Sequence, residues 1–149
     1  MGLNNIKTNQ KGFTIVELLI VIVVIGILAA ITIVAFNGIQ NRGKAASAQS
    51  LANSIVKKAE AHNTIESAYP AAKTNFSATS ESTLDNAASV TDGARGLATG
   101  FPSDEKTVVY VKCTAGNSAQ VIYRDAVTNN HKAIGLGGAA SGVVTAACA

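Results

Sequence analysis

One stretch of the chain, from Phe13 to Phe36, is almost entirely apolar and limits every fold that the sequence can adopt. As an α-helix it would be about 36 Å long, whereas the hydrocarbon core of a bilayer is about 30 Å thick. The twelve residues before it contain Lys7 and Lys11 and no acidic residue. This charge favours a cytoplasmic N-terminus with the bulk of the chain outside. The stretch therefore predicts a membrane-spanning helix near the N-terminus.

Three interpretations of this helix are open. A cleavable secretory signal ends at a small-residue site, but here Ala29 and Ala30 are followed by more apolar residues. A plain signal anchor leaves Glu17 unexplained, because a carboxylate within a spanning helix is costly unless it is paired or lies near the interface. In the third, a cut between Gly12 and Phe13 creates an α-amine that can pair with Glu17 of a neighbouring subunit in a helix bundle, which relieves the cost of burying both charges.

A short basic leader ends in Gly12, and Phe13, Thr14 and the single acid Glu17 open the apolar run that follows. This combination resembles the N-terminus of type IV pilins and the related pseudopilins. The resemblance implies that residues 1–12 are a leader removed by a prepilin peptidase and that Phe13 is N-methylated. It also implies a helical filament of many copies with this helix at its core, in which Glu17 and the Phe13 amine form the assembly charge pair.

The function implied by the resemblance is that of a structural pilin subunit, not an enzyme. Such a subunit is a single-pass protein of the cell membrane before assembly and part of an extracellular type IV pilus afterwards, where it serves adhesion, twitching motility or DNA uptake. Its partners are further copies of the chain, the prepilin peptidase and the pilus assembly machinery. The small head, rich in Ala, Ser and Thr, suits an abundant, major subunit. The alternatives are a type II secretion pseudopilin and a non-polymerising, membrane-anchored extracellular binding domain.

The helix is expected to continue beyond the membrane, because the first proline of the chain is Pro70. Apolar residues recur at three- and four-residue steps in this part, which is typical of one buried helix face. They are Ala45, Ala48, Ala52, Ile55 and Ala59. We therefore expect a helix from Thr14 to about His62, with a transmembrane half at 13–36 and an amphipathic half at 37–62. Gly38 and Gly43 could divide it, and Val34 stands where many pilins have a kinking proline.

The rest of the chain predicts a small β-sheet head. Residues 63–106 are polar and form a variable loop region, with a short helix expected over residues 80–88. Residues 107–149 contain β-branched and aromatic segments separated by turn residues, which is typical of an antiparallel meander. The expected strands cover residues 107–113, 119–124, 131–136 and 143–148. The predicted class is α+β, with the long N-terminal helix packed on an antiparallel sheet of three to four strands.

The two cysteines, Cys113 and Cys148, follow the membrane segment, so one disulfide in an oxidising compartment is expected, against the alternative of two buried thiols. The resemblance independently implies a C-terminal loop closed by a disulfide. The bond would stabilise the domain by roughly 4 kcal/mol in the chain-entropy model.

No catalytic constellation, metal site or cofactor is predicted. His62 and His131 have no metal ligand at motif spacing, and Asp104-Glu105 supplies too few oxygen ligands for Ca²⁺. The formal charge of +3 is largely due to the leader, since ten basic residues face nine acidic ones without it. Binding to DNA or to a host surface is thus unsupported by the sequence.

Overall fold

A computed structural model describes residues 12–78, 82–84, 89–93, 101–114, 116–144 and 148. The chain divides into two units, Met1–Asn37 and Gly38–Ala149. Of the predicted leader, Gly12 alone lies among the described residues.

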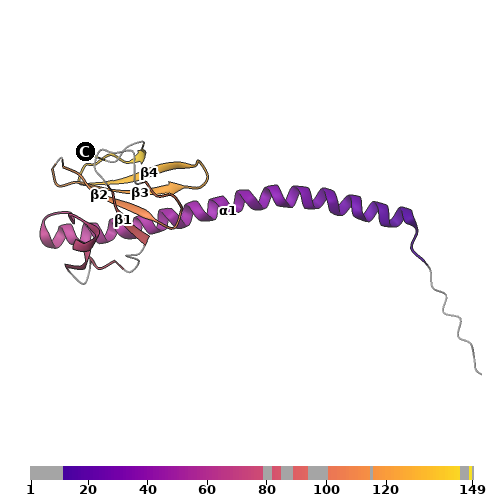
Figure 1. Cartoon of the computed structure of the whole chain (residues 1–149), viewed down its shortest axis with the longest axis horizontal. Coiled ribbons are helices and arrows are strands. Elements are labelled where there is room, and N and C mark those ends of the chain that lie inside the picture. The colour runs from indigo at the N-terminus through magenta and orange to yellow at the C-terminus, as the bar shows by residue number, and fades with distance from the viewer. Residues whose placement is uncertain are drawn as a thin grey trace, which may run out of the picture. The chain divides into compact units, whose positions relative to one another are not determined.

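Helix α1 runs without a break from Ile15 to Glu66 (Figure 1). Its apolar part belongs to the first unit. Ile and Val are abundant in this part and favour strands in water. A helix nevertheless satisfies every backbone polar group within the segment itself, which is the condition for an element in hydrocarbon. Every residue from Gly12 to Asn37 is exposed, and by length and composition α1 can cross a membrane. The predicted transmembrane half, residues 13–36, is thus helical from Ile15 onward, and Gly26 and Val34 both lie within the helix.

In the second unit, one stripe of α1 is buried against the sheet. Its members follow one another at steps of four and three residues, as the sequence pattern predicted. They are Ala48, Ala52, Ile55, Ala59 and His62. The helix continues through Gly38 and Gly43 and ends at Glu66, four residues beyond the expected end at His62. Ser67 then turns the chain with a positive φ of 55°, and Nδ1 of His62 lies 2.9 Å from the carbonyl oxygen of Ala68.

The sheet has five strands in the order β1-β2-β3-β4-β5. The strands are β1 at Val90–Asp92, β2 at Val108–Lys112, β3 at Ala119–Asp125, β4 at Asn130–Leu136 and β5 at Gly142–Val143. The three meander strands β2, β3 and β4 are antiparallel, as predicted, and pair Val109 with Ile122 and Ile122 with Ala133. The last strand is shorter than expected, with two residues.

The prediction of a purely antiparallel sheet was wrong at one edge. β1 pairs parallel to β2, with Val90 opposite Val108, so the sheet is mixed and has one strand more than the upper estimate. The strand lies within residues 63–106, which were expected to be loop, as does the 3₁₀ helix η1 at Lys73–Ala78. Lys73 holds β1 in place, because its N–H donates to Asp92 Oδ1 at 2.6 Å and its ammonium donates to the Val90 carbonyl at 3.2 Å. The helix expected over residues 80–88 lies mostly outside the described residues.

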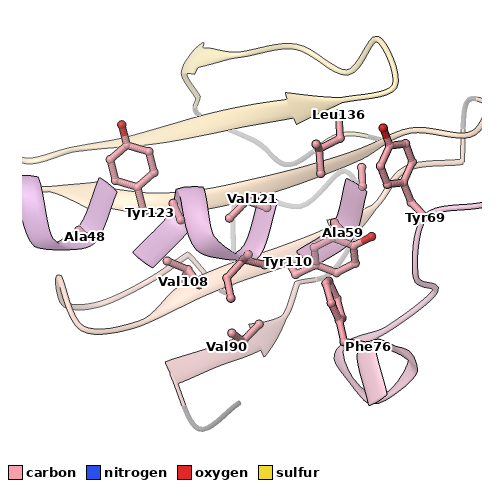
Figure 2. Packing of buried hydrophobic residues seen from close by; sticks show 13 residues of the cluster. Ala48, Ala59, Tyr69, Phe76, Val90, Val108, Tyr110, Val121, Tyr123 and Leu136 are labelled. Atoms are coloured by element: carbon pink, nitrogen blue, oxygen red, sulfur yellow. The ribbon is translucent and has the colours of Figure 1, made fainter. Parts of the chain in front are cut away.

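Each face of the sheet carries its own apolar cluster. The face towards α1 buries the larger cluster around Tyr110, whose ring meets that of Phe76 edge-on at a centroid distance of 4.9 Å (Figure 2). The Tyr110 hydroxyl donates to the Pro70 carbonyl at 2.9 Å and so ties the segment after the helix to the sheet. The opposite face carries a smaller cluster of Val109, Val111, Ile122 and Ala133. This face is the one that the C-terminal residues contact.

Candidate processing site at the start of the apolar helix

The predicted cleavage site lies outside the helix. Gly12, Phe13 and Thr14 have no helical assignment, and the Phe13 side chain is 84% exposed. The first i→i+4 bond of the helix runs from the Leu18 N–H to the Thr14 carbonyl at 3.3 Å. Thr14 is therefore the N-cap residue of α1, and the Gly12–Phe13 peptide bond precedes it.

Thr14 and Glu17 cap the helix reciprocally. The Thr14 hydroxyl accepts the Glu17 N–H at 3.2 Å, and the Glu17 carboxylate accepts the Thr14 N–H at 2.8 Å. The Thr14 hydroxyl also donates to the same carboxylate oxygen at 2.8 Å. This is a capping box, in which the side chains at the N-cap and at position N3 satisfy each other's free backbone donors.

The capping box was missed by the sequence reasoning, although its signal was present. Thr14-Ile15-Val16-Glu17 has the spacing of Ser or Thr followed three residues later by Glu or Gln before an apolar run. The carboxylate of Glu17 was considered only as a charge to be paired between subunits. In the uncleaved chain it already has two donors within its own helix, so it need not be unpaired before assembly.

Cleavage after Gly12, N-methylation of Phe13 and the charge pair between Glu17 and the Phe13 amine remain predictions. The structure places Phe13 and Glu17 on either side of the N-cap, at the same end of α1. An α-amine formed at Phe13 would be attached one residue before Thr14, whose own N–H already donates to Glu17. The chemistry that this end of the helix could support is thus proteolysis of an exposed, non-helical segment and pairing of a carboxylate with an amine.

The disulfide prediction is confirmed. Cys113 follows β2 directly and is bonded to Cys148, with their Cα atoms 5.4 Å apart. The alternative of two free, buried thiols is excluded, because all cysteines of the described residues are in this bond.

The residues set aside in the sequence have structural partners. His131 stacks on Phe101 with ring centroids 4.8 Å apart, and its Nε2 lies 3.2 Å from the Pro102 carbonyl oxygen. Asp104 accepts the Thr107 hydroxyl and the Lys106 N–H, and these hydrogen bonds lower the pKa of its carboxyl. Among the described residues, no three His, Cys, Asp or Glu side chains are grouped so that they could hold a metal ion.

Comparison with known proteins identifies the N-terminal segment. Residues 7–33 match the prokaryotic N-terminal methylation motif. A type IV major fimbrial protein FimA and a fimbrial protein, both of Dichelobacter nodosus, are each 51% identical to the chain over 49 residues, which is 33% of this chain and 31% of theirs. FimA of Dichelobacter nodosus strain VCS1703A is 47% identical over 49 residues. The chain therefore spans about a third of the length of these curated relatives. No solved structure matches it.

Proposed function

We propose that this chain, whose N-terminal segment is that of the type IV pilin family, is a structural subunit of a type IV pilus. The observation that carries the proposal is Glu17, the single acid of the apolar segment from Phe13 to Phe36, which lies in the first turn of α1 and within the residues that match the methylation motif. A membrane anchor can use this carboxylate only to cap its own helix, whereas a filament subunit can also pair it with a charge on another copy. Similarity to major fimbrial proteins supports the same class of function.

Processing is proposed as the first step. A prepilin peptidase cleaves the Gly12–Phe13 bond, and Phe13 is then N-methylated. The capping box supports this step, because it begins the helix at Ile15 and leaves the peptide bond to be cut in non-helical, exposed chain. A peptide bond inside a helix would first have to be unwound, at the cost of its hydrogen bonds.

Assembly is proposed as the second step. The apolar helix anchors the subunit in the cell membrane, with the head outside, until it moves into the core of the filament with other copies. Large apolar side chains from Phe13 to Phe36 are half or more exposed along nearly the whole segment and need such a covering. Two charges taken from water stabilise the assembly only as a pair, so an incoming Glu17 is expected to meet the Phe13 amine of a neighbour.

The test uses cells that contain the peptidase and the assembly machinery. Mass spectrometry of the subunit should give a mature chain that begins at Phe13 with one added methyl group, and sheared filaments should contain it. Replacement of Gly12 should block processing. Glu17→Ala should be processed normally and assemble poorly, because it loses both the charge and the cap.

Glu17→Gln separates these two roles, since its amide oxygen still accepts from Thr14 while the charge is gone. Filament yield as low as that of Glu17→Ala is expected from Glu17→Gln if charge pairing drives assembly. Normal filaments from either variant would show that the charge pair is not needed. An intact leader on the surface-exposed protein would instead indicate a membrane-anchored domain that does not polymerise.

A further inference from the structure

On either side of β5, residues 139–141, Val144 and Cys148 cover the sheet face that is opposite to α1. Val144 and Cys148 pack against the smaller apolar cluster there. The approach is close at Gly135 of β4, where an added Cβ would lie 1.8 Å from the Ala139 carbonyl oxygen. The Gly135 N–H also donates to the Ser141 hydroxyl at 2.8 Å, and the Val144 N–H donates to the His131 carbonyl at 3.0 Å. We call these residues the C-terminal cover.

Gln120 of β3 lies beneath the cover and is 2% exposed. Its Oε1 accepts the backbone N–H of Cys148 at 2.8 Å, and its Nε2 donates to the Ala140 carbonyl at 2.8 Å. A buried carboxamide is costly unless its donor and its acceptor are both used. Gln120 therefore favours one position of the cover, in which the residues at 140 and 148 are held at the same time.

The side chain lies next to the place where the disulfide forms. Gln120 is directly opposite Val111 of β2, and Cys113 is two residues beyond Val111 on the same sheet face. The Cys113 N–H donates to the Ser118 carbonyl at 3.0 Å, so the turn between β2 and β3 holds this cysteine. Gln120 holds the other cysteine through its backbone. The backbone of each cysteine thus makes a hydrogen bond to another residue in addition to the disulfide.

We propose that Gln120 is a positioning residue for disulfide formation, which brings Cys148 to Cys113 in the reduced, already folded head. In the exchange step, one cysteine thiolate attacks a small disulfide oxidant such as oxidised glutathione and releases one glutathione thiol. The second thiolate attacks the mixed disulfide and releases the other. The protein loses two electrons and two protons, and the oxidant gains both. This inference does not depend on filament assembly.

The first test measures the effective concentration of the two thiols. The full chain in detergent micelles is equilibrated with buffers of reduced and oxidised glutathione, quenched, alkylated and analysed by mass spectrometry. Gln120→Leu removes both hydrogen bonds at similar volume and should lower the effective concentration about fivefold or more, since one buried hydrogen bond holds Cys148. Gln49→Leu on the exposed side of α1 is the matched control and should leave it unchanged. A change of less than about twofold in Gln120→Leu would overturn the proposal.

A second measurement keeps Gln120 and therefore does not depend on how its variants fold. In the full chain with Cys113→Ser and Cys148→Ser, the backbone N–H of residue 148 should remain hydrogen-bonded to Gln120. Its hydrogen exchange, measured by NMR in micelles, should be about tenfold or more slower than in the same chain unfolded in urea. Exchange at the unfolded rate would show that the cover docks only after the disulfide has formed, and the proposal would be wrong.

Discussion

At the scale of single residues, Glu17 has local partners in the uncleaved chain, and the predicted cleavage would place an amine close to it. In the uncleaved chain its carboxylate accepts the N–H and the hydroxyl of Thr14. Removal of the leader would add a positive charge one residue before Thr14, at the helix end where the unpaired N–H groups already favour an anion. The local partners could be predicted from the Thr-x-x-Glu spacing. A partner in a neighbouring subunit cannot be derived from one chain, because it depends on how copies pack.

The capping box predicts a difference between two substitutions of Thr14. Thr14→Val has the same shape but cannot accept the Glu17 N–H, so the first turn of α1 should fray and this amide should exchange about fivefold faster. Thr14→Ser retains the hydroxyl and should exchange as the native chain does. Hydrogen exchange by NMR in detergent micelles measures both. Equal protection in the Val and Ser variants would contradict a role for the hydroxyl.

Asp125 predicts a dependence of head stability on pH. Lys132 donates to its carboxylate at 2.5 Å, and this hydrogen bond lowers the pKa of Asp125 from 3.8 to about 2. A carboxyl whose pKa is lower in the folded than in the unfolded state stabilises the fold at pH values above its ordinary pKa. This stabilisation is lost as the pH falls from about 4 to 2. The Lys132 side chain is 35% exposed, so solvent screening limits the effect to about 1 kcal/mol.

Urea unfolding followed by circular dichroism between pH 6 and pH 2 measures this loss. Asp125→Asn should reduce the fall in unfolding free energy between pH 4 and pH 2. Lys132→Met should reduce it similarly, because the hydrogen bond that lowers the pKa of Asp125 is gone. An Asp125→Asn protein that loses as much stability as the native chain in this window would show that the pair does not act in this way.

At the scale of elements, the long strands that pair with their neighbours in sequence could be predicted. The short strand β1 at one edge of the sheet could not. The strands β2, β3 and β4 were expected from β-branched and aromatic residues that form local hairpins, and the short turns between them fix their register. β1 has three residues, and Val90 is its only buried one. Its parallel pairing with β2 depends on the tertiary contacts that Lys73 makes, and these have no periodic signal in the sequence.

The helix stripe explains why small residues recur in the outer part of α1. Ala52 is fully buried against the cluster around Tyr110, so Ala52→Leu should overfill this contact and destabilise the head by about 1–3 kcal/mol. Ala46 is exposed on the same helix, so Ala46→Leu should change the unfolding free energy by about 0.5 kcal/mol or less. Urea unfolding followed by circular dichroism compares the two. A similar cost for both would mean that the stripe is not closely packed.

At the scale of the whole molecule, the two units differ in the polarity of their exposed surfaces. Among the residues that the structure describes, the large exposed apolar side chains lie between Phe13 and Ile39, with three exceptions. The exceptions are Ile65, Val127 and Val143, which are scattered singly as on any soluble domain. The sequence could predict this division, because the apolar residues are concentrated in one run. The covering of the second sheet face by residues 139–141, 144 and 148 could not be predicted, since most of these residues are small and they carry almost no hydrophobic pattern.

This division predicts how the chain partitions between water and detergent. A chain that begins at Gly38 retains the buried stripe of α1, the sheet and the disulfide, and should enter the aqueous phase of a detergent phase separation as a monomer. A chain that begins at Phe13 lacks the leader but keeps the apolar helix, so it should enter the detergent phase as the full chain does, because about 20 apolar residues suffice to span a bilayer. Gel analysis of both phases measures the partition, and size-exclusion chromatography measures the oligomeric state of the head. A head that enters the detergent phase or aggregates would show that it exposes apolar surface of its own, and the apolar part of α1 would then not be the sole cause of membrane association.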